Sequence, residues 1–477
     1  MKSLIIWPKS EGVVHINYHY TQFGEVVDYL NRKTNNSIIS IDCDIENIDI
    51  INVIKNNDIT KVIIQVNYEN AKNSFELASK LKKQFEGISL LAYGPLTVML
   101  PKLFINSNFD AIFKNGDFET CIESFLKYYN KNSNLLEQCN NLSGMYIIDK
   151  GQLLKTKSGK YIEANEWGMS KEEQVPVKEY DRRKGKNRYV INISRGCPFG
   201  CPHCLIQLTE GRRERRRGIQ NLEKSIGKIK DKYRHLKIWA ANFTLDKEYV
   251  RDFCKMMERK YPEITWECAT RIDLVKDKEM LKEMYTAGCR QISLGIESLN
   301  NEELIHTKNF RESQIFKAIS DIQSAGIQVK GCIMLGMPNQ TKESIVNTLK
   351  FLTDNHVIIR PTIYTPYHIL GENTDINQLS QYNRKTLRNN NVPGVTARQL
   401  LQLVKEPYDY EEILNLKDDK GKVNIKRDDD TITPKQIAQL TKEKMASNPG
   451  YISIQLQEIS KEFDKSLKEK EENERHR

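Results

Sequence analysis

Apolar runs and amphipathic segments alternate along the first part of the chain. Short apolar runs of strand length are separated by segments such as 23–32 and 74–85, whose apolar residues recur at helical spacing. This alternation is typical of parallel strands joined by crossover helices. We therefore expect an α/β fold that opens with a doubly wound, Rossmann-like domain over residues 1–131. Its strands are expected at Leu4–Trp7, Ser37–Ile41, Lys61–Val66, Ser89–Ala92 and Ala111–Phe113.

The alternation stops between residues 132 and 187. Two short apolar runs, Met145–Ile148 and Leu153–Leu154, flank Lys150 and Gly151 in a pattern typical of a hairpin. Charged and polar sequence follows them. We expect this stretch to be a connecting segment between two domains.

A second alternation of strands and helices starts at Tyr189 and repeats six times. Its helical segments carry apolar stripes, for example Ile219, Leu222 and Ile226. Six such units predict a partial (β/α)6 TIM-like barrel over residues 188–370, with its site at the carboxyl ends of the strands. The expected strands are Val190–Ile193, Lys237–Ala240, Thr265–Ala269, Gln291–Leu294, Val329–Leu335 and Val357–Tyr364.

The pattern weakens over residues 371–477. We expect a small, mainly helical C-terminal region there, with a short helical segment after Thr433. The end of the chain from Lys461 is charged and poor in apolar residues, which predicts a mobile tail.

Composition and the lengths of the apolar runs bear on the location of the protein and on its partners. Apolar runs such as Leu4–Trp7 and Cys332–Leu335 are far shorter than the roughly 20 residues that cross a bilayer. The first residues lack the pattern of a signal peptide. We therefore expect no membrane association and a cytoplasmic location. The formal net charge of +10 is spread along the chain without a recognisable nucleic-acid-binding module, so nucleic acid is disfavoured as a partner.

Three of the ten cysteines are clustered, namely Cys197, Cys201 and Cys204. They follow directly on the first expected barrel strand, where such a barrel builds its site. Three neighbouring thiolates can hold three irons of a four-iron cubane and leave the fourth iron open. The alternative is a structural zinc site, which needs a fourth ligand from His203 or from a distant residue. The other cysteines are expected to be buried packing residues: Cys43, Cys121, Cys139, Cys254, Cys268, Cys289 and Cys332.

The spacing C-x-x-x-C-x-x-C after a barrel strand resembles the signature of the radical S-adenosylmethionine (SAM) superfamily. With the arginine-rich run at 211–217, it is similar to the branch that places a cobalamin-binding-type domain before the radical barrel. The resemblance implies a [4Fe-4S] cluster on the three cysteines, SAM on the open iron, and cobalamin as a further cofactor. It continues through Asn242–Asp246, Thr270–Asp273, Ser293–Ser298, Gly331–Pro338 and Tyr364–Tyr367.

The resemblance also implies roles for residues at the ends of the later barrel strands. Arg271 and Glu297 resemble the polar residues that hold the ribose and the methionine end of SAM, and their charges suit those groups. A salt bridge across the barrel mouth is the alternative for each. Gly331 is implied to let the backbone approach the adenine, and Ile333 to make an apolar contact with it. Glycine at such a position also marks a β-bulge.

This chain departs from the family pattern at several positions. His203 stands where an aromatic residue is usual, and we interpret it as stacking near the adenine. Ala240 and Ala241 replace an acidic pair, which leaves Asn242 as the substitute partner for the methionine amino group. The run at 212–217 is interpreted as structural or as contacting a phosphate-bearing cofactor, with a solvated helix entrance as the alternative.

The implied cobalamin site lies in the first domain. Gly94 and Gly116 follow the fourth and fifth strands, where this type of fold brings its backbone close to the corrin. The D-x-H-x-x-G sequence that supplies a histidine to cobalt is missing, and His15 and His19 occur in the wrong context. We therefore expect base-off cobalamin without a histidine ligand.

Together these expectations describe an enzyme that cleaves SAM reductively and uses the 5'-deoxyadenosyl radical on an unactivated C–H bond, with cobalamin-dependent methyl transfer as the outcome. A cobalamin-independent cyclisation, rearrangement or oxidation is the alternative. An RNA-modifying protein is disfavoured, because the first domain has no additional cysteine trio and no RNA-binding barrel is appended. The expected partners are a small-molecule or peptide substrate and an external electron donor such as flavodoxin or ferredoxin.

Overall fold

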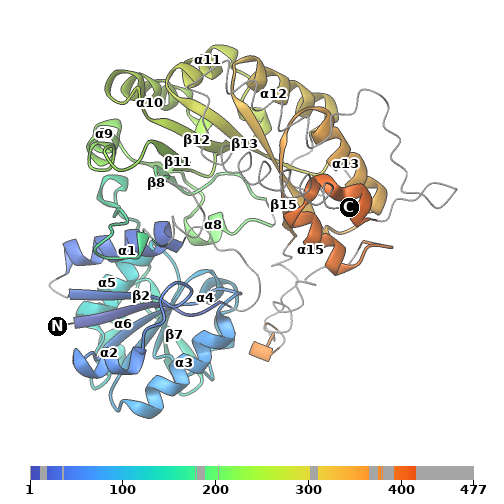
Figure 1. The fold of residues 1–477 in the computed structure, drawn as a ribbon. Coiled ribbons are helices and arrows are strands. Elements are labelled where there is room, and N and C mark those ends of the chain that lie inside the picture. Colours follow the sequence, from blue (N-terminus) through green and yellow to red (C-terminus); the bar gives the residue numbers. More distant parts are fainter. Residues whose placement is uncertain are drawn as a thin grey trace, which may run out of the picture. The chain divides into compact units, whose positions relative to one another are not determined.

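The chain folds into two compact units, which a computed structural model describes over residues 2–10, 19–34, 37–177, 179, 188–201, 203–300, 310–364, 374–377, 379 and 392–414 (Figure 1). Unit 1 comprises 1–182, 194–218 and 365–388, and unit 2 comprises 183–193, 219–364 and 389–477. The helical segment expected after Thr433 and the tail from Lys461 lie outside the described residues. No helix in the described ranges is long and apolar enough to cross a membrane.

Unit 1 is built on a seven-stranded sheet in the order β2-β1-β3-β4-β5-β6-β7. Its first five strands are parallel and confirm the five predicted from the apolar runs. Because β1 lies between β2 and β3, the chain winds outward in both directions, as a doubly wound fold does. The strands are β1 (Lys2–Trp7), β2 (Ser37–Asp42), β3 (Lys61–Gln65), β4 (Ser89–Tyr93), β5 (Ala111–Phe113), β6 (Met145–Asp149) and β7 (Gln152–Lys155).

Helices cover both faces of this sheet. Leu4 and Ile6 of β1 share one core with Ile54 and Leu81 from two of the helices. On the other face Trp7 meets the ring of Phe23, 6.3 Å away between centroids. The helices are α1 (His19–Lys33), α2 (Ile50–Asn56), α3 (Ala71–Gln84), α4 (Pro95–Met99), α5 (Phe118–Tyr128), α6 (Leu135–Asn141) and the short α8 (Ile206–Thr209), with 3-10 turns η1 (Pro101–Phe104) and η2 (Ala164–Glu166).

The hairpin predicted within the connecting segment forms, but it belongs to the sheet. Strand β6 pairs antiparallel with β5 and with β7, and Lys150 and Gly151 both have positive φ in the turn. Pairing satisfies the backbone groups that the edge of β5 would otherwise leave open. The apolar pattern showed the hairpin itself, whereas its partner strand left no signal in the local sequence.

Unit 2 contains a six-stranded sheet in which the strands follow one another in chain order, β15-β14-β13-β12-β11-β8. All its neighbours are parallel, which confirms the six strands of the predicted partial barrel. The strands are β8 (Tyr189–Asn192), β11 (His235–Trp239), β12 (Thr265–Thr270), β13 (Cys289–Glu297), β14 (Gln328–Leu335) and β15 (Ile358–Ile363). The helices are α9 (Ile219–Gly227), α10 (Lys247–Lys260), α11 (Lys278–Thr286), α12 (Glu312–Ser324), α13 (Lys342–Asp354), α15 (Ala397–Lys405) and α16 (Tyr410–Ile413), with 3-10 turns η3 (Phe243–Leu245), η4 (Ile272–Leu274) and η6 (Pro407–Asp409).

The C-terminal helices cover the edge of this sheet at β15. Leu400 and Leu403 of α15 are buried, and α15 contacts β15. The hydroxyl of Tyr408 accepts a hydrogen bond from the Ile359 backbone N–H at 3.1 Å. Backbone groups on the open edge of β15 thus find a partner from the end of the described chain.

A buried charged triad lies near the amino ends of the strands of unit 2. Glu267, the third residue of β12, receives the Arg188 guanidinium at 2.6 Å and the Lys330 ammonium at 3.5 Å. Burial alone raises the pKa of this carboxyl, but the charges of Lys330 and Arg188 outweigh burial and hold the pKa well below its usual value. Folded unit 2 therefore keeps Glu267 ionised to lower pH than an ordinary carboxyl.

The prediction that the seven isolated cysteines are buried is confirmed for four of them. Cys43, Cys139 and Cys332 are only partly buried, so the prediction is wrong for these three. Cys332, for example, lies on the face of β14 opposite that of Gly331 and Ile333. Apolar context gave the type of element but not the face on which each thiol lies.

Candidate active site

Residues 194–218, here called the cysteine loop, are closed by a short ladder within unit 1. β9 (Ser194–Arg195) pairs antiparallel with β10 (Arg215–Arg216), placing Arg195 opposite Arg215. Between them Gly196 has φ +90°, and a Cβ at that position would collide with the carbonyl oxygen of Arg213. The glycine before Cys197 is therefore required by close backbone approach.

The three predicted cluster ligands lie on this loop. Cys197 is 7% exposed, and its N–H donates to the Gly211 carbonyl oxygen at 3.1 Å. The Cys204 N–H donates to the Cys201 carbonyl oxygen at 3.0 Å, forming a tight turn. Burial raises the pKa of the Cys204 thiol, and the negative charges that Cys201 and Cys197 carry when ionised raise it further.

This donor set fits three irons of a cubane. Thiols are the ligands of iron–sulfur clusters, and one loop supplies three of them. Among the described residues no group of three or more His, Cys, Asp or Glu side chains is already gathered around a point as a metal site. The ligand role of the three cysteines therefore stays a prediction that rests on their chemistry and their common loop.

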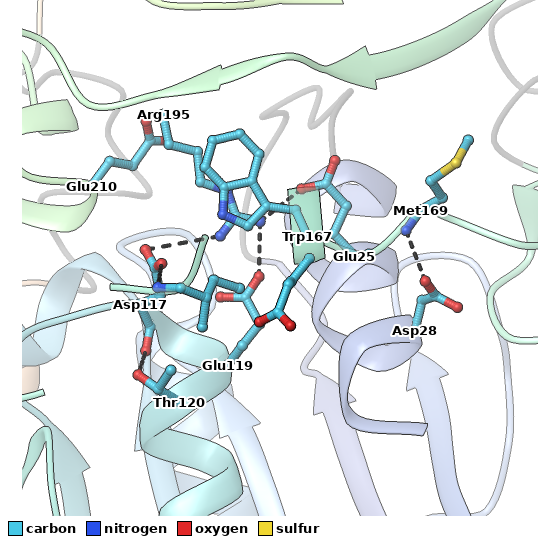
Figure 2. A network of polar contacts seen from close by, with 12 residues as sticks. Glu25, Asp28, Asp117, Glu119, Thr120, Trp167, Met169, Arg195 and Glu210 are labelled. Carbon is cyan, nitrogen blue, oxygen red and sulfur yellow. Dashed lines mark hydrogen bonds and ion pairs between the residues drawn. The ribbon is translucent and has the colours of Figure 1, made fainter. Parts of the chain in front are cut away.

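Arg195 anchors the cysteine loop to two helices of unit 1 (Figure 2). Its guanidinium lies 2.9 Å from the Glu25 carboxylate on α1 and 2.8 Å from the Glu119 carboxylate on α5. It also lies over the indole of Trp167, 4.6 Å from the ring centroid. Only 9% of the Arg195 side chain is exposed, so these contacts are well shielded from solvent.

Two further arginines hold the C-terminal end of the cysteine loop. Both guanidinium nitrogens of Arg215 donate to the Asp117 carboxylate, at 2.6 and 2.8 Å. Arg217 donates to the backbone carbonyls of Trp167 and Gly168 at 3.1 and 2.6 Å. The structural interpretation of the arginine-rich run is confirmed for Arg215 and Arg217. We call Glu25, Asp117, Glu119, Trp167, Arg195, Arg215 and Arg217 the loop anchor.

Two carboxylates, those of Glu25 and Glu119, share the single guanidinium of Arg195. Burial raises the pKa of Glu25, and the positive charges of Arg195 and Arg217 only partly offset this. The nearby Glu119 carboxylate acts in the same direction as burial. Glu25 and Glu119 could not be recognised from sequence, because Glu25, for example, is 170 positions from Arg195 and belongs to an ordinary amphipathic helix.

The two glycines proposed to face a corrin are both needed by the protein backbone itself. Gly94 has φ +126°, and a Cβ there would lie 2.6 Å from the Val66 carbonyl oxygen. Gly116 has φ +90° and packs against the backbone of Gly159 and Lys160. Their contact with cobalamin stays a prediction. Helix α4, which begins directly after Gly94, contacts α8 of the cysteine loop.

In unit 2 the residues proposed to hold SAM lie at strand ends, as expected. Arg271 follows β12, and its guanidinium makes a paired contact with Asp273 at 2.9 and 3.1 Å. This ion pair is local, between residues two positions apart, and is not the salt bridge across the barrel mouth that was the alternative for Arg271. Glu297 ends β13, is 6% exposed and has φ +65°, a strained value for a residue with a side chain. Contacts of both residues with SAM stay predictions.

The remaining SAM residues have different environments. A Cβ on Gly331 would meet Val357, Ile296 and Leu352, so the space beside this glycine is filled by apolar packing. Ile333 lies on the same face of β14 and is 1% exposed. Cys332 and Met334, on the opposite face, are partly exposed; the sequence analysis assigned Cys332 to buried packing and gave Met334 no role.

Asn242 and His203, where this chain departs from the family pattern, also differ in burial. Asn242 is 4% exposed and directly precedes η3, where its carbonyl accepts from Leu245. His203 is half-buried in the cysteine loop. Their contacts with SAM stay predictions as well.

A loop with three closely spaced cysteines after the first strand of a six-stranded parallel sheet defines a class of radical enzyme that carries an iron–sulfur cluster. Residues 191–352 match the family model described as "Radical SAM superfamily". These residues form the radical SAM domain of the chain, and such a domain implies a [4Fe-4S] cluster and SAM.

Curated and solved proteins resemble the chain beyond that segment. It is 23% identical over 326 residues to an uncharacterized methyltransferase of Pyrococcus horikoshii, covering 67% of this chain and 70% of that protein. It is 26% identical over 287 residues to the anaerobic magnesium-protoporphyrin IX monomethyl ester cyclase of Cereibacter sphaeroides, covering 56% and 46%. The fold is similar to that of the radical SAM methyltransferase TsrM from Kitasatospora setae, solved with cobalamin and a [4Fe-4S] cluster, with a TM-score of 0.62, 12% identity and 77% of each chain covered.

Proposed function

We propose that this radical SAM enzyme is a cobalamin-dependent methyltransferase that acts on an unactivated carbon. One observation carries the proposal: the cysteine loop belongs to the same compact unit as the Rossmann-like sheet. Helix α8 of the loop contacts α4, which starts after Gly94 at the carboxyl end of β4. Ligands of doubly wound folds bind at the carboxyl ends of the strands. A corrin bound there would be close to a cluster on the loop.

The relatives support the same chemistry. The Pyrococcus horikoshii protein is named a methyltransferase, and TsrM is a methyltransferase solved with both cofactors. The similarity to TsrM covers 77% of this chain, much more than residues 191–352 alone. It is therefore consistent with a shared cobalamin-type domain as well as a shared radical domain.

When bound, the cofactors supply the difficult chemistry: reductive cleavage of SAM gives a radical that removes hydrogen from the substrate, and cobalamin delivers the methyl group. The residues of the chain hold and shield these groups. Cys197, Cys201 and Cys204 would hold the cluster, and the loop anchor keeps their loop against unit 1. In unit 2 Asp273 fixes the plane of the Arg271 guanidinium, the group proposed to contact a ribose hydroxyl.

Cobalt binding tests the proposal. Protein incubated with hydroxocobalamin and then desalted should retain close to one cobalt per chain. Its spectrum should be that of base-off cobalamin, and His15→Ala and His19→Ala should leave the spectrum unchanged. Retention of less than about a tenth of an equivalent of cobalt, at a cofactor concentration where a micromolar site is nearly full, would refute the proposed cobalamin-dependent methyltransferase function.

That result would favour the second candidate, a cobalamin-independent radical reaction such as cyclisation. The cyclase of Cereibacter sphaeroides is the observation that keeps this candidate in view. Both candidates need the cluster, so iron content does not separate them and cobalt content does.

A further inference from the structure

The arginine-rich run of the cysteine loop divides into two parts. Arg215 and Arg217 point into the loop anchor, and Arg216 pairs with Glu214. Arg212 and Arg213 are exposed, and neither makes an ion pair with any residue in the described part of the chain. Two adjacent guanidiniums are therefore left facing solvent without a role in holding the loop.

This arginine pair is close to the expected cluster along the backbone. The peptide carbonyl of Gly211, the residue before Arg212, accepts the hydrogen bond from the Cys197 N–H. The carbonyl oxygen of Arg213 packs against Gly196, the residue before Cys197. Only one hydrogen bond therefore separates the backbone that carries the arginine pair from that of the first cluster cysteine.

The surface around the pair is hollowed. A cavity of about 580 Å³ is lined by Arg212 and Arg213 together with Tyr161, Glu163 and other loop residues. Glu163 is the exposed acid in this lining, whereas Glu210 and Glu214 are half-buried and Glu214 is paired with Arg216. The exposed part of the hollow thus carries an excess of positive charge.

We propose that Arg212 and Arg213 form the docking site for an acidic one-electron carrier protein that reduces the cluster. This rests on the proposed function, since only reductive cleavage of SAM requires such a donor. Electron-transfer complexes are small and brief, and opposite charges at the rim speed their formation. A short basic patch beside the cluster loop suits an encounter of this kind better than it suits RNA, which needs a basic surface that tracks many phosphates.

The electron transfer balances without a further reactant. A reduced flavin in its anionic hydroquinone form gives one electron and becomes the neutral semiquinone. The oxidised cluster accepts that electron and later passes it to SAM, whose C5'–S bond breaks to give methionine and the deoxyadenosyl radical. No proton has to cross the docking surface.

Stopped-flow reduction of the reconstituted cluster provides the test. The donor is a small acidic flavodoxin in its hydroquinone form, and cluster bleaching is followed at several ionic strengths. Arg212→Glu/Arg213→Glu should slow the second-order reduction by about tenfold or more at low salt, and Arg212→Gln/Arg213→Gln by less. The wild-type rate should fall as salt rises, and this dependence should flatten in the charge-reversed protein.

Two controls isolate docking. Lys80→Glu/Lys83→Glu makes the same change in net charge at exposed positions of α3. These positions are near the amino end of β4, whereas Gly94 follows its carboxyl end. This control should alter the rate by no more than about twofold. Reduced methyl viologen, which needs no protein docking, should reduce all variants at similar rates.

Several outcomes would overturn the proposal. Equal slowing by the α3 control would show that net charge alone matters, and an unchanged rate in the Arg212/Arg213 variant would exclude docking there. Loss of iron from that variant would make the pair structural. RNA binding that depends on the pair, with unchanged flavodoxin kinetics, would assign it to RNA. A wild-type protein without a cluster would instead refute the proposed function, before docking is tested.

Discussion

Two buried charge clusters, one in each unit, use the same residue types in opposite proportions. In unit 2 one carboxylate, Glu267, is shared by two cations, Arg188 and Lys330. In unit 1 one guanidinium, Arg195, is shared by two carboxylates, Glu25 and Glu119. The pKa of Glu267 is lowered and that of Glu25 is raised, although both side chains are buried.

The difference shows that charge count, rather than burial or the presence of an arginine, decides the state of a buried acid. Desolvation raises the pKa of both carboxyls. At Glu267 the surrounding positive charges, led by Lys330 and Arg188, outweigh it. At Glu25 the charges of Arg195 and Arg217 only partly offset it, and the Glu119 carboxylate adds to it. The triad in unit 2 has two cations for one carboxylate and lies near the amino ends of the strands. In unit 1 two carboxylates share the Arg195 guanidinium, although the loop anchor as a whole contains three acids and three arginines.

The largest effect is expected from Glu267→Gln, which leaves Arg188 and Lys330 buried without a negative partner. Breaking a buried ion pair in this way costs about 3–5 kcal/mol. Hydrogen–deuterium exchange should accelerate in β12 to β14 and stay unchanged in β1 to β4. Glu263→Gln, at an exposed pair with Arg234, is the matched control and should cost less than about 1 kcal/mol. Equal effects from the two variants would contradict the role given to the triad.

A smaller effect is expected from Arg195→Met, because Glu25, whose pKa is already raised by burial, can take up a proton when the guanidinium is lost. We expect about 1–3 kcal/mol, less than for Glu267→Gln. Exchange should accelerate in the cysteine loop, around Glu25 in α1 and in the first turn of α5, with unit 2 unaffected. Arg195→Lys keeps the charge and should recover part of the protection. If hydrogen–deuterium exchange of the cysteine loop is unchanged in Arg195→Met, the loop anchor does not position that loop.

The smallest effect is a dependence on pH whose sign differs between the clusters. The folded state raises the pKa of Glu25, so wild-type stability falls as pH rises above the ordinary carboxyl range, and the cost of Glu25→Gln shrinks. The folded state lowers the pKa of Glu267, so stability falls as pH drops below that range, and the cost of Glu267→Gln shrinks there. Unfolding of the variants from about pH 2 to about pH 7 measures both, the Glu25 trend in the upper part of this range and the Glu267 trend in the lower part. Parallel trends would contradict the charge-count account.

Local sequence pattern predicted the strands of both units well, because parallel strands buried on both faces leave continuous apolar runs. It also placed Cys197, Cys201 and Cys204 on one loop. It did not predict that β6 extends the first sheet, nor that Glu25 and Glu119 meet Arg195. Those contacts join positions far apart in the chain, and an acid on an amphipathic helix looks the same whether it meets solvent or a buried arginine.

Glycines were the least informative site residues. Gly94, Gly116 and Gly331 were each assigned to make room for a cofactor, yet close backbone or apolar neighbours already account for glycine at every one. A glycine records that something approaches closely, but not what approaches. In the arginine-rich run, conversely, five similar residues have different roles, which only the fold separates.

The central claim is that Cys197, Cys201 and Cys204 hold a [4Fe-4S] cluster that cleaves SAM. Anaerobic reconstitution should give about four irons and four sulfides per chain. Release of 5'-deoxyadenosine should follow when SAM and a strong reductant are added. Cys197→Ala, Cys201→Ala and Cys204→Ala should each abolish both signals, whereas Cys254→Ala, at a buried cysteine of α10, should leave both unchanged. Zinc in place of iron after anaerobic isolation, or a full cluster in any of the three variants, would contradict the account.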